Sequence, residues 1–132
     1  MSLTHLNPAS LHTNPAFSQG VLTEGAPLLF VGGQNGTDSA GEIVSDDLGE
    51  QTAQAFRNVL AVLSEGGADQ SDVAKLTIYL QAGQDVTAGY QAAGEVWGAQ
   101  PTAITVLQVP GFARPDVLVE IDAVAVLPVG VS

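Results

Sequence analysis

Residues 117–127 constrain the fold most strongly, because their side chains should divide between the two faces of one long strand. One face would be wholly apolar and is predicted to lie against helices. The other would carry the acids Glu120 and Asp122 beside three large aliphatic side chains, a mixture that suits neither a solvated face nor a closed core. We therefore expect this second face to pack against other copies of the chain, with a pocket at its edge. The apolar face comprises Val117, Val119, Ile121, Ala123, Ala125 and Leu127.

Two helices are predicted upstream of this strand. Over residues 48–64, apolar side chains recur at the spacing of one helical face, and a Gly-Gly pair follows. Over residues 86–97, a second helix is weakened by Gly89 and Gly94, each costing about 1 kcal/mol relative to alanine. The order β-β-α-β-α-β-β indicates an α+β domain of two layers, with both helices on one face of a mixed sheet. The four further strands are expected near residues 17–23, 28–33, 73–80 and 104–109.

The length of 132 residues suits a single domain, residues 1–132, in which residues 1–16 are expected to be an extended lead-in. The absence of cysteine excludes disulfides and thiol catalysis. The N-terminus lacks the basic start and apolar core of a signal peptide, and no apolar run approaches the roughly 20 residues that cross a bilayer. We therefore expect a soluble, cytoplasmic protein.

The charge balance limits the partners. Fourteen acidic residues against three basic ones give a net charge of −11. A protein that binds nucleic acid must neutralise phosphates with lysine and arginine, and three cations cannot form a basic patch. The same charge repels anionic lipid. Nucleic acids and membrane surfaces are therefore not expected as partners.

Glu120 and Asp122 are the candidate catalytic pair when the residues are considered alone. On a strand they would project from one face, with Cα atoms roughly 6.5 Å apart. Paired carboxylates can divide acid and base roles when their environments differ, although alternating acids on a strand are more often simply solvated. Both histidines, His5 and His12, lie in the lead-in, and no spacing of His, Asp and Glu resembles a metal site. No metal is expected.

The glycine-rich stretch of residues 32–36 lacks the lysine and the spacing of a phosphate-binding loop. It is better interpreted as a strand end that another group approaches closely. Among the three cations, Arg57 and Lys75 are predicted to be exposed or structural charges. Arg114 is the cation expected nearest to the Glu120 face, and a surface role is favoured for it.

Five runs, in order along the chain, resemble the YjgF/RidA family, also called the Rid, reactive-intermediate-deaminase or endoribonuclease L-PSP-like family. They are NPAFSQGV at residues 14–21, FVGGQ at 30–34, EQTAQAFRNV at 50–59, DVAKLTIYL at 72–80 and VEIDAVA at 119–125. The resemblance implies a chorismate-mutase-like α+β fold, assembled as a homotrimer with ligand clefts between subunits. It also implies hydrolysis of reactive enamines and imines to a 2-oxo acid and ammonia, without metal or organic cofactor.

The resemblance also assigns roles to individual residues. Glu120 matches the family's acid, which would activate water or transfer a proton. Gly33 matches the glycine whose backbone meets the ligand. Phe17 stands where tyrosine is common, and Thr105 stands where cysteine, serine or threonine is usual.

The chain departs from the family at the carboxylate anchor. The family's run there is similar to Pro-Ala-Arg-Ser, whereas residues 101–104 read PTAI, so that Ala103 replaces the arginine. An arginine–carboxylate pair is among the strongest side-chain contacts, and alanine cannot form it. Two hypotheses follow. The protein is a deaminase of an imine or enamine other than the usual 2-imino acids, with Arg114 as a possible replacement cation, or it is a non-catalytic trimer that binds a small metabolite or has a regulatory role.

Overall fold

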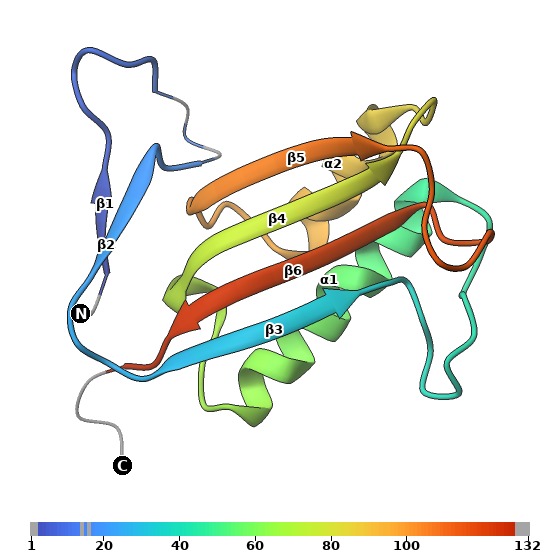
Figure 1. Ribbon diagram of the computed structural model, residues 1–132, viewed down its shortest axis with the longest axis horizontal. Coiled ribbons are helices and arrows are strands. Elements are labelled where there is room, and N and C mark those ends of the chain that lie inside the picture. Colours follow the sequence, from blue (N-terminus) through green and yellow to red (C-terminus); the bar gives the residue numbers. More distant parts are fainter. Residues whose placement is uncertain (1–2, 14, 16, 129–132) are drawn as a thin grey trace.

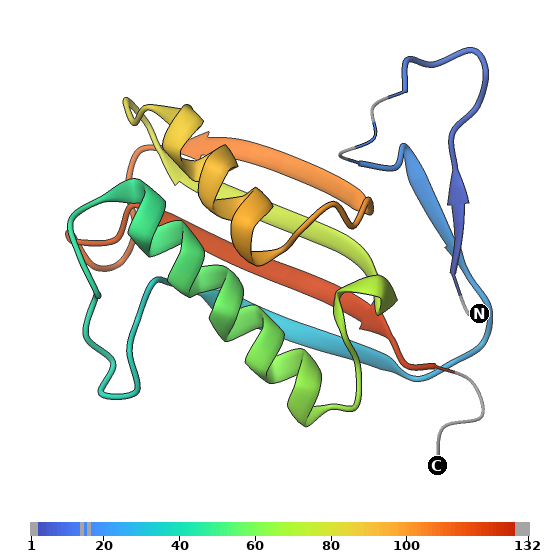
Figure 2. The ribbon, with the colours of Figure 1, turned by 180° about the vertical axis from the view of Figure 1, so that it is seen from behind.

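The computed structural model describes residues 3–13, 15 and 17–128. Residues 14 and 16, which belong to the first of the five runs, lie outside the described residues. The molecule has two layers, a four-stranded sheet with both helices on one of its faces (Figures 1 and 2). Its elements are β1 (Leu3–Leu6), β2 (Gly20–Thr23), β3 (Leu28–Gln34), α1 (Leu48–Glu65), β4 (Val73–Gln81), α2 (Val86–Val96), β5 (Ala103–Val109) and β6 (Val119–Val126), with a 3₁₀ turn at Gln70–Asp72.

The main sheet is mixed, as predicted. Its strand order is β3-β6-β4-β5, in which β6 pairs antiparallel with both β3 and β4, while β4 and β5 run parallel. The helices cover one face (Figure 2), and Figure 1 looks onto the other, which we call the open face. The fold class predicted from the order of elements is therefore confirmed.

The alternation predicted over residues 117–127 holds as far as Ala125, whereas Val126 is also buried and Leu127, beyond the end of β6, is only half-buried. Val119, Ile121 and Ala125 are fully buried, and they belong to the same core cluster as Phe56 and Leu63 of α1. Helix α1 begins where Asp47 caps it, because the Asp47 side chain accepts a hydrogen bond from the backbone N–H of Glu50. Among the described residues, no helix is long and apolar enough to cross a membrane.

The N-terminal region differs from the prediction. The expected lead-in contains a strand, β1, which pairs antiparallel with β2 to form a separate two-stranded ribbon. The strand expected at residues 17–23 is correspondingly shorter, because Ser18 instead forms an isolated parallel bridge with Ala103 at the start of β5. The ribbon lies beside the end of the main sheet at which β4 and β5 begin (Figure 1). The turn at residues 24–27 therefore joins two different sheets.

Candidate functional site

The strand register arranges the polar side chains of the open face in three rows, because paired residues on neighbouring strands point to the same side. The pairing of β4 with β5 and β6 defines these rows. The first row contains the β5 residue Ala103 and the last contains Glu120 of β6. We call the part of the open face around the first row the Ala103 end, and the part around the last row the Glu120 end. The rows are Phe30, Val124, Lys75 and Ala103, then Asp122, Thr77 and Thr105, then Glu120, Tyr79 and Leu107.

At the Glu120 end, the half-buried carboxylate of Glu120 lies against the backbone of Gly33. A Cβ atom added at Gly33 would lie 2.5 Å from Glu120 Oε2, so only glycine leaves room for this contact. The other oxygen, Oε1, accepts a hydrogen bond from Asn35 Nδ2 at 3.2 Å. The structure therefore brings together Gly33 and Glu120, to which the resemblance assigned separate roles.

Asn35 was not among the predicted site residues. Its side chain also donates to the backbone carbonyl oxygen of Val119. The backbone carbonyl oxygen of Asn35 accepts a hydrogen bond from the side chain of Asn58 in α1 at 3.0 Å. These bonds fix the segment that directly follows β3 relative to both β6 and α1. The sequence signal was its place in the glycine-rich stretch of residues 32–36, which predicted a close approach to the backbone without identifying the side chain involved.

Asp122 has a different environment from Glu120. Its Oδ2 atom accepts a hydrogen bond from the Tyr79 hydroxyl at 3.0 Å. That hydrogen bond raises the pKa of Tyr79 above its ordinary value of 10.0, and the charge of Asp122, burial and the charge of Glu120 add to the effect. Each carboxylate thus accepts one side-chain hydrogen bond, and Glu120 is the better candidate for proton transfer because it also lies against the exposed backbone of Gly33.

The start of β5 is held firmly from both sides. The buried Thr102 hydroxyl donates to the carbonyl oxygen of Val73 at 2.6 Å, which fixes β5 against β4. On the other side, the Ser18 N–H donates to the carbonyl oxygen of Thr102 at 2.6 Å. Ala103 therefore lies between two neighbouring backbone segments.

The side chains around Ala103 are mostly polar. Lys75 pairs with Ala103 in the β4–β5 register, and its Nζ donates a hydrogen bond to Thr105 Oγ1. Beyond Ala103, the Ser18 hydroxyl lies 2.6 Å from His5 Nδ1 of β1. Phe17 adjoins Ser18, so the predicted ligand-binding residues at positions 17, 103 and 105 lie at the same end.

Phe17 itself is half-buried, and its ring packs edge-to-face on His12 with centroids 5.8 Å apart. The sequence interpretation treated Lys75 as a structural charge and assigned no role to Ser18 or His5. Alternation along β4 could have placed Lys75 on the open face. Its proximity to Ala103 depends on the parallel pairing with β5, which the sequence pattern does not give.

The Ala103 end and the Glu120 end are far apart within one chain. Position 103 pairs with Lys75, whereas Glu120 pairs with Tyr79 four residues further along β4. Four residues along a strand and two strand spacings across the sheet place these ends about 16 Å apart. Because this is the separation of the Cα atoms, a molecule as short as a 2-imino acid does not span the two ends of one chain.

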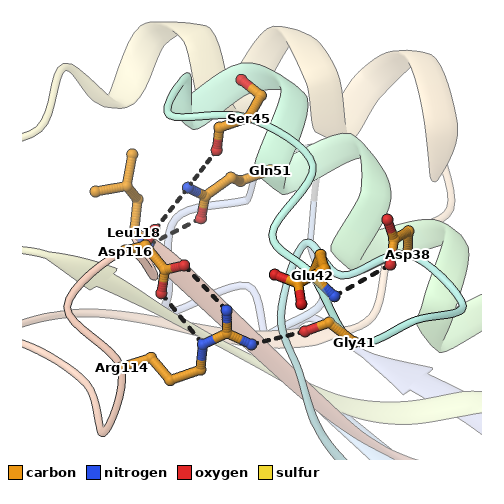
Figure 3. Close-up of polar contacts among 8 residues, drawn as sticks. All are labelled: Asp38, Gly41, Glu42, Ser45, Gln51, Arg114, Asp116 and Leu118. Atoms are coloured by element: carbon orange, nitrogen blue, oxygen red, sulfur yellow. Dashed lines mark hydrogen bonds and ion pairs between the residues drawn. The ribbon is translucent and has the colours of Figure 1, made fainter.

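Arg114 lies in the loop before β6, at the opposite end of the sheet from Ala103. Its Nε and Nη2 atoms donate to the two carboxylate oxygens of Asp116 at 3.2 and 3.0 Å, and Nη1 donates to the Gly41 carbonyl oxygen at 2.7 Å (Figure 3). The ion pair is partly exposed, with relative side-chain accessibilities of 43% and 50%. Arg114 therefore connects residues 38–42 to the loop that leads into β6.

Gln51 of α1 connects the same two loops from within the protein. It is fully buried, and its side-chain amide donates to the carbonyl oxygens of Ser45 and Asp116 at 2.8 and 2.9 Å. Its Oε1 atom accepts a hydrogen bond from the Leu118 N–H at 2.9 Å (Figure 3). These bonds support the segment immediately before Glu120.

Within residues 3–13, 15 and 17–128, no group of three or more His, Cys, Asp and Glu side chains could hold a metal ion. The geometry instead offers a carboxylate beside an exposed strand end at one end of the open face. At the other end it offers a group of hydrogen-bond donors around a small residue. Both arrangements suit a polar small molecule.

Known proteins resemble this chain over most of its length. The sequence profile of the family described as Endoribonuclease L-PSP matches residues 8–127. A RutC family protein of Pyrococcus abyssi is 37% identical over 98 residues, which span 74% of this chain and 76% of the relative. The human 2-iminobutanoate/2-iminopropanoate deaminase is 29% identical over 111 residues, which span 83% of this chain and 79% of the relative.

The solved structures agree with the sequence relatives. The crystal structure of a Rid family protein of unknown function from Yersinia pestis superimposes with a TM-score of 0.86 at 30% identity, covering 96% of this chain and all of the other. The chain therefore belongs to the endoribonuclease L-PSP family, which is the YjgF/RidA family that its five sequence runs resemble.

Proposed function

We propose that the protein is a homotrimer that hydrolyses an imine or enamine in clefts between its subunits, and that its substrate is not a usual 2-imino acid. The observation that carries the proposal is the position of Glu120, whose carboxylate lies against Gly33 with one oxygen bonded to Asn35. The name of the human relative, a 2-iminobutanoate/2-iminopropanoate deaminase, supports the reaction class.

The separation of the two ends supports assembly. A cleft that uses both ends requires the Ala103 end of one chain and the Glu120 end of another, since the two lie about 16 Å apart in one copy. The open face also exposes large apolar side chains, with Phe30 70% and Leu107 45% accessible. Covering this face with further copies removes that apolar surface from water.

The proposed chemistry needs only water and one carboxylate. Glu120 accepts a proton from water as the water oxygen attacks the carbon of the C=N bond, and it passes this proton to the nitrogen to give a carbinolamine. Glu120 then takes the proton of the carbinolamine hydroxyl and delivers it to the nitrogen as the C–N bond breaks. Cleavage of the C–N bond releases ammonia and leaves a carbonyl product, without oxidation or reduction. An enamine is first protonated at carbon to give the imine. Asn35 would hold the carboxylate in position during both proton transfers.

The substrate proposal depends on Ala103. A short 2-imino acid carries its carboxylate next to the reacting carbon, where an arginine could bind it with two parallel hydrogen bonds. An alanine at that position provides no charge and no donor. We therefore expect little acceleration of 2-iminopropanoate hydrolysis by this protein.

The test measures ammonia and 2-oxo-acid release from 2-imino acids that an amino-acid oxidase generates in the assay. Wild type, Ala103→Arg and Glu120→Gln are compared with the spontaneous rate. We expect a gain of activity in Ala103→Arg, and a loss of roughly a hundredfold or more when Glu120→Gln is added to it. An Ala103→Arg/Glu120→Gln variant as active as Ala103→Arg would contradict the assigned role of Glu120.

A non-catalytic trimer that binds a small metabolite is the second candidate. Two observations favour it. Position 103, the expected anchor, is alanine, and Arg114, the possible replacement, is already bonded to Asp116 and Gly41. This candidate predicts ligand binding with no imine hydrolysis by wild type across neutral and charged imines. Turnover of any of them above the spontaneous rate, dependent on Glu120, would exclude it.

A further inference from the structure

The Ala103 end contains donors that the hydrolysis step does not use. Lys75 is one of three cations in a chain of net charge −11. Arg57 is exposed on α1, and Arg114 is paired with Asp116. Among the described residues Lys75 forms no ion pair, and its ammonium group instead donates to the Thr105 hydroxyl. This cation is therefore not neutralised within the part of the chain that the structure describes.

The residues around this cation lie in one row. Ser18, Ala103 and Lys75 follow one another on three neighbouring backbone segments, with Ala103 in the middle. Adjacent segments in a sheet are about 4.8 Å apart, so a single methyl group separates the Ser18 and Lys75 side chains. Ser18 is only 3% exposed, and its hydroxyl is held by His5.

The chemistry of this row suits an anion. The Lys75 ammonium and the Ser18 hydroxyl of this row, with the Thr105 hydroxyl of the neighbouring row, offer hydrogen bonds to a carboxylate, and bonds to charged groups are stronger than those between neutral partners. No carboxylate belongs to the Ala103 row, and the one carboxylate in the neighbouring row that contains Thr105, that of Asp122, accepts a hydrogen bond from the Tyr79 hydroxyl. The small side chain of Ala103 leaves the space above the row open, whereas an arginine at this position would extend into it.

We propose that Lys75, Thr105 and Ser18 form an anion subsite for the carboxylate of the substrate, a proposal that rests on the function proposed above. The Lys75 ammonium group is held close to the sheet, because it donates to the hydroxyl of the short Thr105 side chain, so a carboxylate must reach deeper to meet it than to meet an extended arginine at position 103. The substrate class is therefore an imine or enamine whose carboxylate is separated from the reacting carbon by several methylene groups. The distance between the carboxylate and the reacting carbon distinguishes this class from 2-imino acids.

Two isomeric probes test this difference. 5-Oxohexanoate and 2-oxohexanoate have the same composition and charge, and differ in the distance between carbonyl and carboxylate. Neutral hexan-2-one reports binding without the anion. Calorimetric titration of the assembled wild-type protein with each probe should show 5-oxohexanoate binding about tenfold more tightly than 2-oxohexanoate, as one charge-assisted contact predicts.

Variants test the roles of Lys75 and Thr105. Lys75→Met should abolish the preference for 5-oxohexanoate while leaving the affinity for hexan-2-one unchanged, and Thr105→Val should reduce it. Arg57→Met is the matched control, since it removes the same charge from an exposed position on α1 and should retain the preference. Thr105→Val provides an independent test if Lys75→Met fails to fold.

Three results would overturn the subsite. They are equal affinities for the two isomers, an undiminished preference in folded Lys75→Met, and no binding of 5-oxohexanoate by folded wild type. Failure of the catalytic proposal is distinguishable, because a Lys75-dependent preference without any imine turnover supports the subsite and contradicts only hydrolysis.

Discussion

Replacing Gln51 by methionine should weaken the support of the Glu120 end and destabilise the whole protein. Methionine keeps the length and approximate volume of the side chain and suits a helix, so that the change removes the amide without creating a large cavity. Three backbone groups lose their partner, namely the carbonyl oxygens of Ser45 and Asp116 and the N–H of Leu118.

The size of the effect follows from these three bonds. An unpaired buried polar group costs about 1–3 kcal/mol. We use the lower limit for each group, because Asp116 is exposed and Ser45 and Leu118 are only half-buried, so water can reach them in part. The expected loss is about 3 kcal/mol of unfolding free energy, or about 11 °C in Tm for a chain of this length.

The assay is urea unfolding followed by the fluorescence of Trp97, which is 4% exposed and reports on the core. Wild type and variant are compared at one protein concentration, because assembly shifts apparent stability. Gln91→Met makes the same chemical change at an exposed position on α2 and should alter stability by less than about 0.5 kcal/mol. A loss below about 1 kcal/mol in Gln51→Met would refute the reasoning, because the three groups would then be satisfied without Gln51.

Gly33→Ala places a Cβ atom 2.5 Å from Glu120 Oε2, so the carboxylate must move. Added to Ala103→Arg, it should lower the rate of 2-imino-acid hydrolysis roughly a hundredfold, with an unchanged circular dichroism spectrum. Tyr79 should ionise above pH 10, because its pKa is raised, and Tyr79→Phe should remove that step from the absorbance titration at 295 nm. The stabilising Tyr79–Asp122 bond is present below pH 10 and should be lost as the pH rises through the folded-state pKa. Phe30→Glu places a charge on the open face and should reduce the mass in light scattering from three chains to one chain of 13.4 kDa, and an unchanged trimer would contradict assembly through this face.

The main layers of the fold could be predicted because their patterns are long. The alternation over residues 117–127 and the helical spacing over residues 48–64 each repeat several times, which separates strand from helix. Strand β1 has only four residues, Leu3–Leu6, and offers too little repetition to be distinguished from an extended lead-in. Its existence depends on pairing with β2, a partner that no local pattern identifies.

The site could be predicted in part for a similar reason. Alternation and resemblance identified Glu120 and Gly33, and the structure adds the contact between them. Asn35 reaches Glu120 only because β3 and β6 are adjacent and their register shifts between Val31 and Gln34. Contacts of this kind depend on which strands become neighbours, and that is a property of the whole sheet.

The effect of alanine at position 103 also depends on its neighbours in the sheet. Considered alone, the substitution makes the cleft less suited to an anion. The parallel pairing of β4 and β5 nevertheless places Lys75 directly beside Ala103, with its ammonium group on Thr105. The charge available to a ligand therefore keeps its sign, while its position moves from the end of a long side chain to the surface of the sheet. A change of position selects a longer substrate, whereas a loss of charge would select a neutral one. The comparison of 5-oxohexanoate with hexan-2-one tests whether a cation is available, because only a charged site favours the anion, and the comparison with 2-oxohexanoate tests the position of that cation.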